Sequence, residues 1–147
     1  MDASDKPPAV PRRDVLPWEL DLPPVIRPMW DEVCTGLSAG TFTLVAQGTR
    51  TLVDRVARDL VGPANSFAQG VEMLEREGFI SRRDRTRLDV VVEVGNAAAH
   101  RDMALNEEQA RVLVHIIENL LRCAYFPQKV VDAVKMATPP RTQDRSR

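Results

Sequence analysis

The chain has 147 residues, a length that favours a single domain with one hydrophobic core. Its 44% hydrophobic and 28% charged residues are typical of a globular protein and exclude an intrinsically disordered one. Because 20 Lys and Arg face 21 Asp and Glu, the formal net charge is −1, which excludes a strongly basic nucleic-acid binder but not RNA contact through a small patch.

Proline and glycine positions divide the chain into three parts. Seven of the eleven prolines lie within the first 28 residues, Pro139 and Pro140 lie near the other end, and all seven glycines lie between. We therefore expect an extended Pro-rich leader over residues 1–24, a folded domain over 25–137 and a disordered Arg-rich tail over 138–147.

The leader contains a tryptophan, Trp18, among regularly spaced leucines. One interpretation is that Trp18 packs along the folded domain, and the other is that it docks onto a partner protein as a short linear motif. The leader has no continuous apolar stretch typical of a secretory signal, and the chain has no apolar run long enough to span a membrane. We therefore expect a cytoplasmic protein.

The domain reads as consecutive helices, with apolar residues recurring at three- and four-residue steps. Capping-box patterns at Ser66, Ser81 and Asn106 mark three helix starts, and Gly78 marks a stop. The expected helices cover residues 29–38, 40–60, 66–78, 81–99, 106–126 and 128–136. Residues 90–92 are valines with high strand propensity, but they lie inside a helical pattern. The sequence predicts an all-α bundle of four to five main helices.

Three isolated reactive side chains lie on these helices. Cys34 and Cys123 have no metal-ligand spacing, and we expect both to be buried free thiols in a reducing compartment. His115 lies opposite the apolar stripe of its helix, so we expect it to be exposed.

The helix over residues 82–100 carries the most informative pattern. Its apolar residues spread over more than half of the circumference, which predicts that other helices surround it on several sides. The remaining arc is a narrow row of polar residues, here named the polar line: Arg82, Arg85, Asp89, Glu93, Asn96 and His100.

The polar line has a structural and a functional interpretation. It is either a solvated stripe or a hydrogen-bonded network, with Arg85 joined to Asp89 and Asn96 to His100. Alternatively, His100 is a general acid or base, and Asn96 orients it or a substrate phosphate. A cation site at Asp89 and Glu93 would need further ligands from other helices, so we predict no metal and no cofactor.

Small residues surround the end of the polar line. Gly95 costs about 1 kcal/mol relative to alanine inside a helix, and three alanines follow it before His100. Small side chains let another backbone approach closely, so we expect a tight crossing with a neighbouring helix or with a second copy of the chain.

The string Gly-Asn-Ala-Ala-Ala-His over residues 95–100, after the capped segment EREGFISRRDR, resembles the HEPN superfamily and within it domain-of-unknown-function family 4145. The resemblance covers roughly residues 29–125. It implies a helical bundle that often dimerises and places two copies of an Arg…His motif around a shared cleft. Active members cleave RNA without a metal, and relatives are common in toxin–antitoxin and anti-phage systems. His100 matches the motif histidine and Asn96 its polar companion.

The motif arginine does not carry over, because Val92 and Gly95 stand where the family and the superfamily would place it. A phosphoryl-transfer site without its cation loses most of its stabilisation of the developing charge. Arg85 and Arg101 are candidates to replace it in space, and with Arg82 they are the candidate phosphate contacts.

We therefore expect a HEPN-like interaction module: a homodimer that is a regulatory or structural part of a prokaryotic defence or toxin–antitoxin-type system. Its leader offers a site for a protein partner. Two alternatives stay open. One is a metal-independent endoribonuclease with His100 as acid/base, and the other is RNA or nucleotide binding without cleavage.

Overall fold

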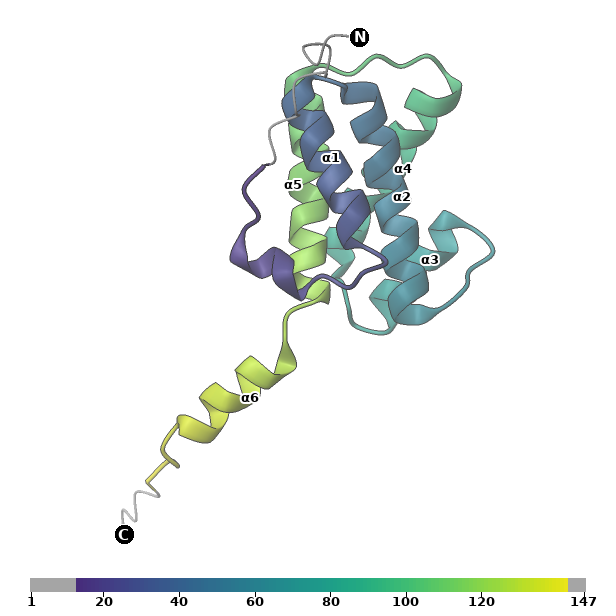
Figure 1. Ribbon diagram of the computed structural model, residues 1–147. Helices are drawn as coiled ribbons and strands as arrows, with labels where there is room; N and C mark the ends of the chain where they lie inside the picture. Colours follow the sequence, from purple (N-terminus) through teal and green to yellow (C-terminus); the bar gives the residue numbers. More distant parts are fainter. Residues whose placement is uncertain (1–12, 143–147) are drawn as a thin grey trace, which may run out of the picture.

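The computed structural model describes residues 13–142, and in this range all regular structure is helical (Figure 1). The elements are η1 (Pro17–Asp21), α1 (Arg27–Ala39), α2 (Phe42–Val61), α3 (Phe67–Arg76), α4 (Arg82–His100), α5 (Glu107–Ala124) and α6 (Gln128–Ala137). Helices α1 to α5 form a bundle, and α6 projects from one end of it (Figure 1). The predicted all-α bundle of four to five main helices is confirmed. Residues 1–12 of the leader and 143–147 of the tail lie outside the described range.

Local hydrogen bonds set the starts of three helices. The predicted capping boxes at Ser81 and Asn106 are both formed, each with reciprocal side-chain and backbone bonds. Ser66 also caps its helix, because its Oγ accepts from the backbone N–H of Gln69 at 3.1 Å. The Gln69 side chain, however, accepts from the backbone N–H of Asn65 at 2.6 Å, so this third box is only half formed.

Helix α2 is the centre of the bundle and packs against α1, α3, α4 and α5. Its buried residues recur at the three- and four-residue steps seen in the sequence: Val45, Ala46, Thr49, Leu52, Val53, Val56 and Ala57. Each fully buried valine or leucine contributes about 1.5–3 kcal/mol of hydrophobic free energy. Among the described helices, none combines the length and the apolar composition that crossing a membrane requires.

Helices α2 and α4 meet most closely at Gly95. A Cβ atom added at Gly95 would lie 2.6 Å from the Cβ of Arg50 and 3.0 Å from the carbonyl oxygen of Ala46, both in α2. These distances leave no room for a side chain. The predicted tight crossing is therefore present, and its partner is a neighbouring helix of the same chain.

Helix α4 packs against α2, α3 and α5. Its fully buried residues, Leu88, Val91, Gly95 and Ala98, share one face, and Val92 and Val94 are partly buried against the core. Val90 on the outer side is 51% exposed. The prediction that helices lie on several sides of α4 is therefore confirmed for its inner half, whereas its outer side lies in solvent.

The leader is anchored by a buried carboxylate. Glu19 is 1% exposed and accepts hydrogen bonds from Arg13, from the indole N–H of Trp30 and, at 2.5 Å, from the backbone N–H of Leu16. Arg13 also reaches Asp31 of α1 at 2.6 Å. Residues 17–21 form a 3-10 helix, so the leader is not extended there as predicted, because Glu19 turns inward to this cluster.

Trp18 packs along the bundle, which is the first of the two arrangements expected from the sequence. Its ring centroid lies 5.7 Å from that of Trp30, with the rings tilted by 57°. The guanidinium of Arg122 lies 5.5 Å from the centroid of the Trp18 ring. A tilted aromatic pair and a cation over the ring both stabilise this position, so the Trp18 side chain is engaged within the chain.

We predict that Glu19→Gln lowers the free energy of unfolding by about 2 kcal/mol at pH 7, because it removes charged hydrogen bonds in a buried cluster. Burial alone would raise the pKa of Glu19, but the hydrogen bonds from Arg13, Leu16 and Trp30 hold that pKa below its usual 4.5. The Glu19 contribution is therefore present above pH 4.5 and disappears as the pH falls through the lowered pKa. Urea unfolding at a series of pH values measures both effects, with exposed Glu32→Gln as the control.

We predict that Gly95→Ala lowers the free energy of unfolding, by up to about 2 kcal/mol. Helix propensity alone would raise it by about 1 kcal/mol, but overpacking at the crossing costs about 1–3 kcal/mol. Val90→Ala, exposed on the same helix, is the control and should change stability little. A stabilised Gly95→Ala variant in urea unfolding would show that the crossing has spare room.

Candidate functional site

The polar line of α4 faces solvent. Arg82, Asp89, Glu93 and His100 are exposed, and Arg85 and Asn96 are half-buried. The capping box at Ser81 starts the helix, and the crossing at Gly95 turns its buried face toward α2. The opposite face, with the polar line, is therefore directed outward.

Two arginines near this line are bound to carboxylates. The Arg85 Nη1 donates to Glu75 Oε2 of α3 at 2.9 Å, and this hydrogen bond raises the pKa of Arg85. Arg101, the residue after α4, forms an ion pair with Glu93. Both candidates to replace the motif arginine are thus neutralised by a neighbouring carboxylate.

The expected internal network of the polar line is not formed. Within residues 13–142, no hydrogen bond or ion pair joins Arg85 to Asp89, and none joins His100 to Asn96 or to an arginine. Arg85 instead reaches across to α3, where its carboxylate partner lies. Polar groups that water can reach, such as the half-buried Asn96 amide and the exposed His100 imidazole, exchange their hydrogen bonds with water at little cost. The solvated stripe is therefore the interpretation that the structure supports.

Sequence reasoning missed Arg50, the arginine that approaches the Gly-Asn segment in space. Its Cβ packs against Gly95, and its guanidinium carbon lies 3.8 Å from the centroid of the Phe67 ring. Its Nε is buried and has no partner among the described residues. In the sequence, Arg50 is only one of several charged residues that follow each other at steps of four in α2. Its nearness to α4 depends on the helix crossing, which no local pattern shows.

The described residues offer no metal site. No group of three or more His, Cys, Asp or Glu side chains in residues 13–142 is arranged to hold a metal ion. Asp89 and Glu93 are both exposed, and Glu93 is paired with Arg101. Acid–base chemistry at this site would depend on His100, because the Asn96 amide can orient a group but does not exchange protons in catalysis.

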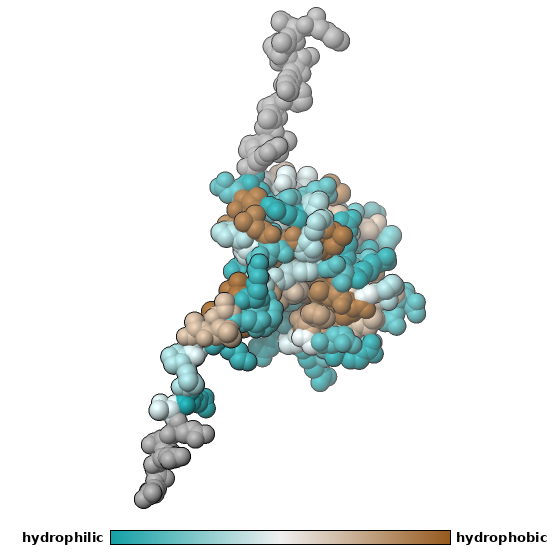
Figure 2. Space-filling view, turned by 60° about the horizontal axis from the view of Figure 1, so that its bottom comes forward, coloured by the Kyte–Doolittle hydropathy of each residue, from teal (hydrophilic) through white to brown (hydrophobic). Residues whose placement is uncertain are grey.

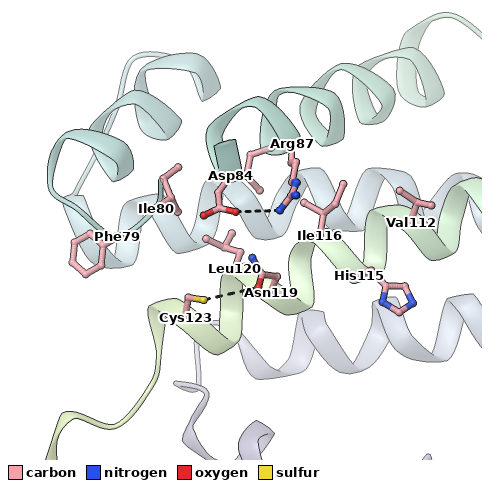
Figure 3. A pocket seen from close by; sticks show the side chains of 11 residues that line it. Phe79, Ile80, Asp84, Arg87, Val112, His115, Ile116, Asn119, Leu120 and Cys123 are labelled. Carbon is pink, nitrogen blue, oxygen red and sulfur yellow. Dashed lines mark hydrogen bonds and ion pairs between the residues drawn. The ribbon is translucent and has the colours of Figure 1, made fainter. Parts of the chain in front are cut away.

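A second feature is an apolar groove between α4 and α5, here named the α4–α5 groove. Its volume is about 270 Å³ (Figure 3). It is lined by Phe79, Ile80, Asp84, Arg87, Leu88, Val112, His115, Ile116, Asn119, Leu120 and Cys123. Buried Ile80, Leu88 and Leu120 belong to the bundle core, and Phe79 and Val112 are exposed. On the face in Figure 2, hydrophobic side chains also gather in patches between hydrophilic ones.

The turn before α4 builds one end of this groove. Gly78 has φ 81°, a left-handed conformation that glycine adopts without strain. The backbone N–H of Phe79 then donates to the Leu74 carbonyl at 2.9 Å, which confirms the predicted helix stop. This turn holds Phe79 beside the end of α5.

The two cysteines and His115 differ in exposure. His115 is exposed, as predicted. Cys34 is half-buried, and burial raises the pKa of its thiol to about 12. Cys123 is exposed in the last turn of α5, so its predicted burial was wrong. Helical periodicity placed Cys123 next to the apolar stripe, but no element of residues 13–142 covers that edge of α5.

A family model described as a domain of unknown function, DUF4145, matches residues 31–144. The chain belongs to the DUF4145 family. The matched region runs from α1 through α6, so α6 is part of the DUF4145 domain and η1 with Glu19 lies before it. Neither a curated protein nor a solved structure matches the chain.

We predict that His100→Ala changes the free energy of unfolding by less than about 0.5 kcal/mol, because exposed side chains without partners contribute little. Urea unfolding at pH 7 measures the change. A loss of more than about 1 kcal/mol would contradict the solvated position of His100 and would point to a packed network on α4.

Proposed function

We propose that this DUF4145 domain is a HEPN-like helical interaction module. It acts as a homodimer in the cytoplasm, as a regulatory or structural component of a prokaryotic defence or toxin–antitoxin-type system. The observation that carries the proposal is the state of the polar line. It retains the asparagine and histidine of the motif, but Arg85 and Arg101, the two candidates to replace the motif arginine, are bound to carboxylates.

This arrangement disfavours RNA cleavage for an electrostatic reason. The transition state of phosphoryl transfer develops negative charge, and a preorganised cation stabilises it. Val92 occupies the family position of that cation. Glu93 holds Arg101, and the same carboxylate would repel an approaching phosphate. His100 by itself supplies a proton-transfer group without the charge stabilisation.

The distribution of apolar residues favours an interaction role. Exposed apolar side chains that gather in patches mark surfaces that bind other proteins. The α4–α5 groove has this character, since Phe79 and Val112 are exposed at its edge, and α6 carries further exposed valines.

We predict that the purified full chain does not cleave tRNA or ribosomal RNA in EDTA, and that His100→Ala gives the same RNA pattern on a denaturing gel. Cleavage by the wild-type chain that His100→Ala abolishes, with the fold unchanged, would replace the proposal by the ribonuclease alternative. Binding of RNA without cleavage, weakening steeply as salt is raised, would indicate the RNA-binding alternative.

A positive test expresses the chain from its natural locus and purifies it with a small affinity tag. A regulatory component is expected to co-purify, in fixed stoichiometry, with a protein encoded beside it, identified by mass spectrometry. Recovery of the chain alone at physiological salt would contradict a role as a stable component of a larger system.

A further inference from the structure

Helix α6 has an apolar face that nothing within residues 13–142 covers. Every residue from Gln128 to Ala137 is exposed, and α6 extends away from the bundle (Figures 1 and 2). At 100° per residue, Val130, Ala133, Val134 and Ala137 fall within about 100° of one another. A helix of 10 residues is only marginally stable in water without tertiary contacts. A surface that covers the valine face would stabilise α6.

The connection to α5 directs α6 away from its own bundle. The hydroxyl of Tyr125, the residue after α5, donates to Asp59 Oδ2 of α2 at 2.7 Å. Pro127, which precedes α6, has an extended backbone with φ −71° and ψ 112°. Tyr125 therefore fixes the start of the linker on the bundle, and the extended Pro127 continues the chain outward.

The α4–α5 groove is about as long as α6 and, like the valine face of α6, it is apolar. Along α5 it runs from Val112 to Cys123, about 17 Å at 1.5 Å per residue, and α6 is about 15 Å long. Its end at Cys123 lies in the last turn of α5, close to the point where α6 leaves. A helix that enters there would run toward Val112.

A polar side chain at one edge of the valine face also fits. Lys129 lies about 40° beyond Ala133 at that edge. Asp84 lies at the rim of the groove, 3.5 Å from Arg87, and Asn119 lies on the α5 side (Figure 3). Their side-chain oxygen atoms are acceptors for the Lys129 ammonium group on a docked helix.

We propose that α6 of one chain docks in the α4–α5 groove of a second copy, which returns its own α6 in exchange. A reciprocal exchange is two-fold symmetric, so it closes as a dimer and covers both apolar surfaces at once. The exchange gives an interface to the homodimer of the proposed function. The exchange does not involve the polar line. A negative result for the exchange would therefore not bear on a catalytic role of His100.

Light scattering across a concentration series tests the exchange on the full chain. Wild type should have twice the mass of one chain, and Val134→Asp, on the docking face, should weaken dimerisation at least tenfold. Lys135→Asp places an aspartate on the side of α6 opposite the docking face and should leave the dimer intact. Val112→Asp, at a groove residue that is 52% exposed, should weaken the dimer as Val134→Asp does. A monomeric wild type, or a Val134→Asp dimer of unchanged affinity, would overturn the proposal.

A disulfide test identifies which copy supplies the helix. Val130→Cys introduces a thiol on the docking face of α6, opposite Cys123 at the near end of the groove. Mild oxidation should give a covalent dimer on a non-reducing gel, and the dimer should be lost when Cys123→Ser is added. Cys34 is half-buried, with its thiol pKa raised to about 12, and stays protonated at pH 8. A disulfide within one chain, or none at all, would overturn the exchange.

Discussion

The close approach of α4 to α2 at Gly95 is the constraint on which the rest of the bundle depends. Without a side chain at Gly95, the backbone of α4 rests against Arg50 and the Ala46 carbonyl. This contact decides which face of α4 is buried against the central helix. It also decides that His100, at the end of the same helix, lies in solvent. The position of the candidate site is thus a consequence of packing at one glycine.

The near-zero net charge of the chain is also seen locally, where arginine side chains lie next to carboxylates. On the surface, arginines pair with nearby carboxylates, as Arg85 does with Glu75 and Arg101 with Glu93. Such exposed pairs stabilise the fold little, but they neutralise Arg85 and Arg101 near the polar line. The buried Glu19 differs, because it is hydrogen-bonded from several sides and ties the leader to α1. Charge therefore positions the leader and at the same time engages two arginines near the polar line within the chain.

Helices α1 to α5 complete a core without α6. The core residues come from the leader, the first five α helices and the loops between them, and none comes from α6. Yet the DUF4145 match includes α6, and the bundle presents an apolar groove of similar length. A helix that is dispensable for the core but belongs to the family domain is well suited to join two copies.

The sequence by itself determined the helices, most of their caps and the family. Periodicity and capping depend on residues three or four positions apart, so Ser81 and Asn106 marked helix starts correctly. The string ending at His100 likewise pointed to the DUF4145 family. These features are local, and neighbouring residues are enough to specify them.

Only the tertiary structure decided which faces are covered and which charges are paired. The burial of Glu19 needs Trp30, eleven residues away, and the approach of Arg50 to Gly95 needs two helices to cross. Exposure of Cys123 and the burial of the inner face of α4 likewise depend on which elements lie alongside. Burial and ion pairing depend on distances between elements, and these distances are set by how side chains pack rather than by their order along the chain.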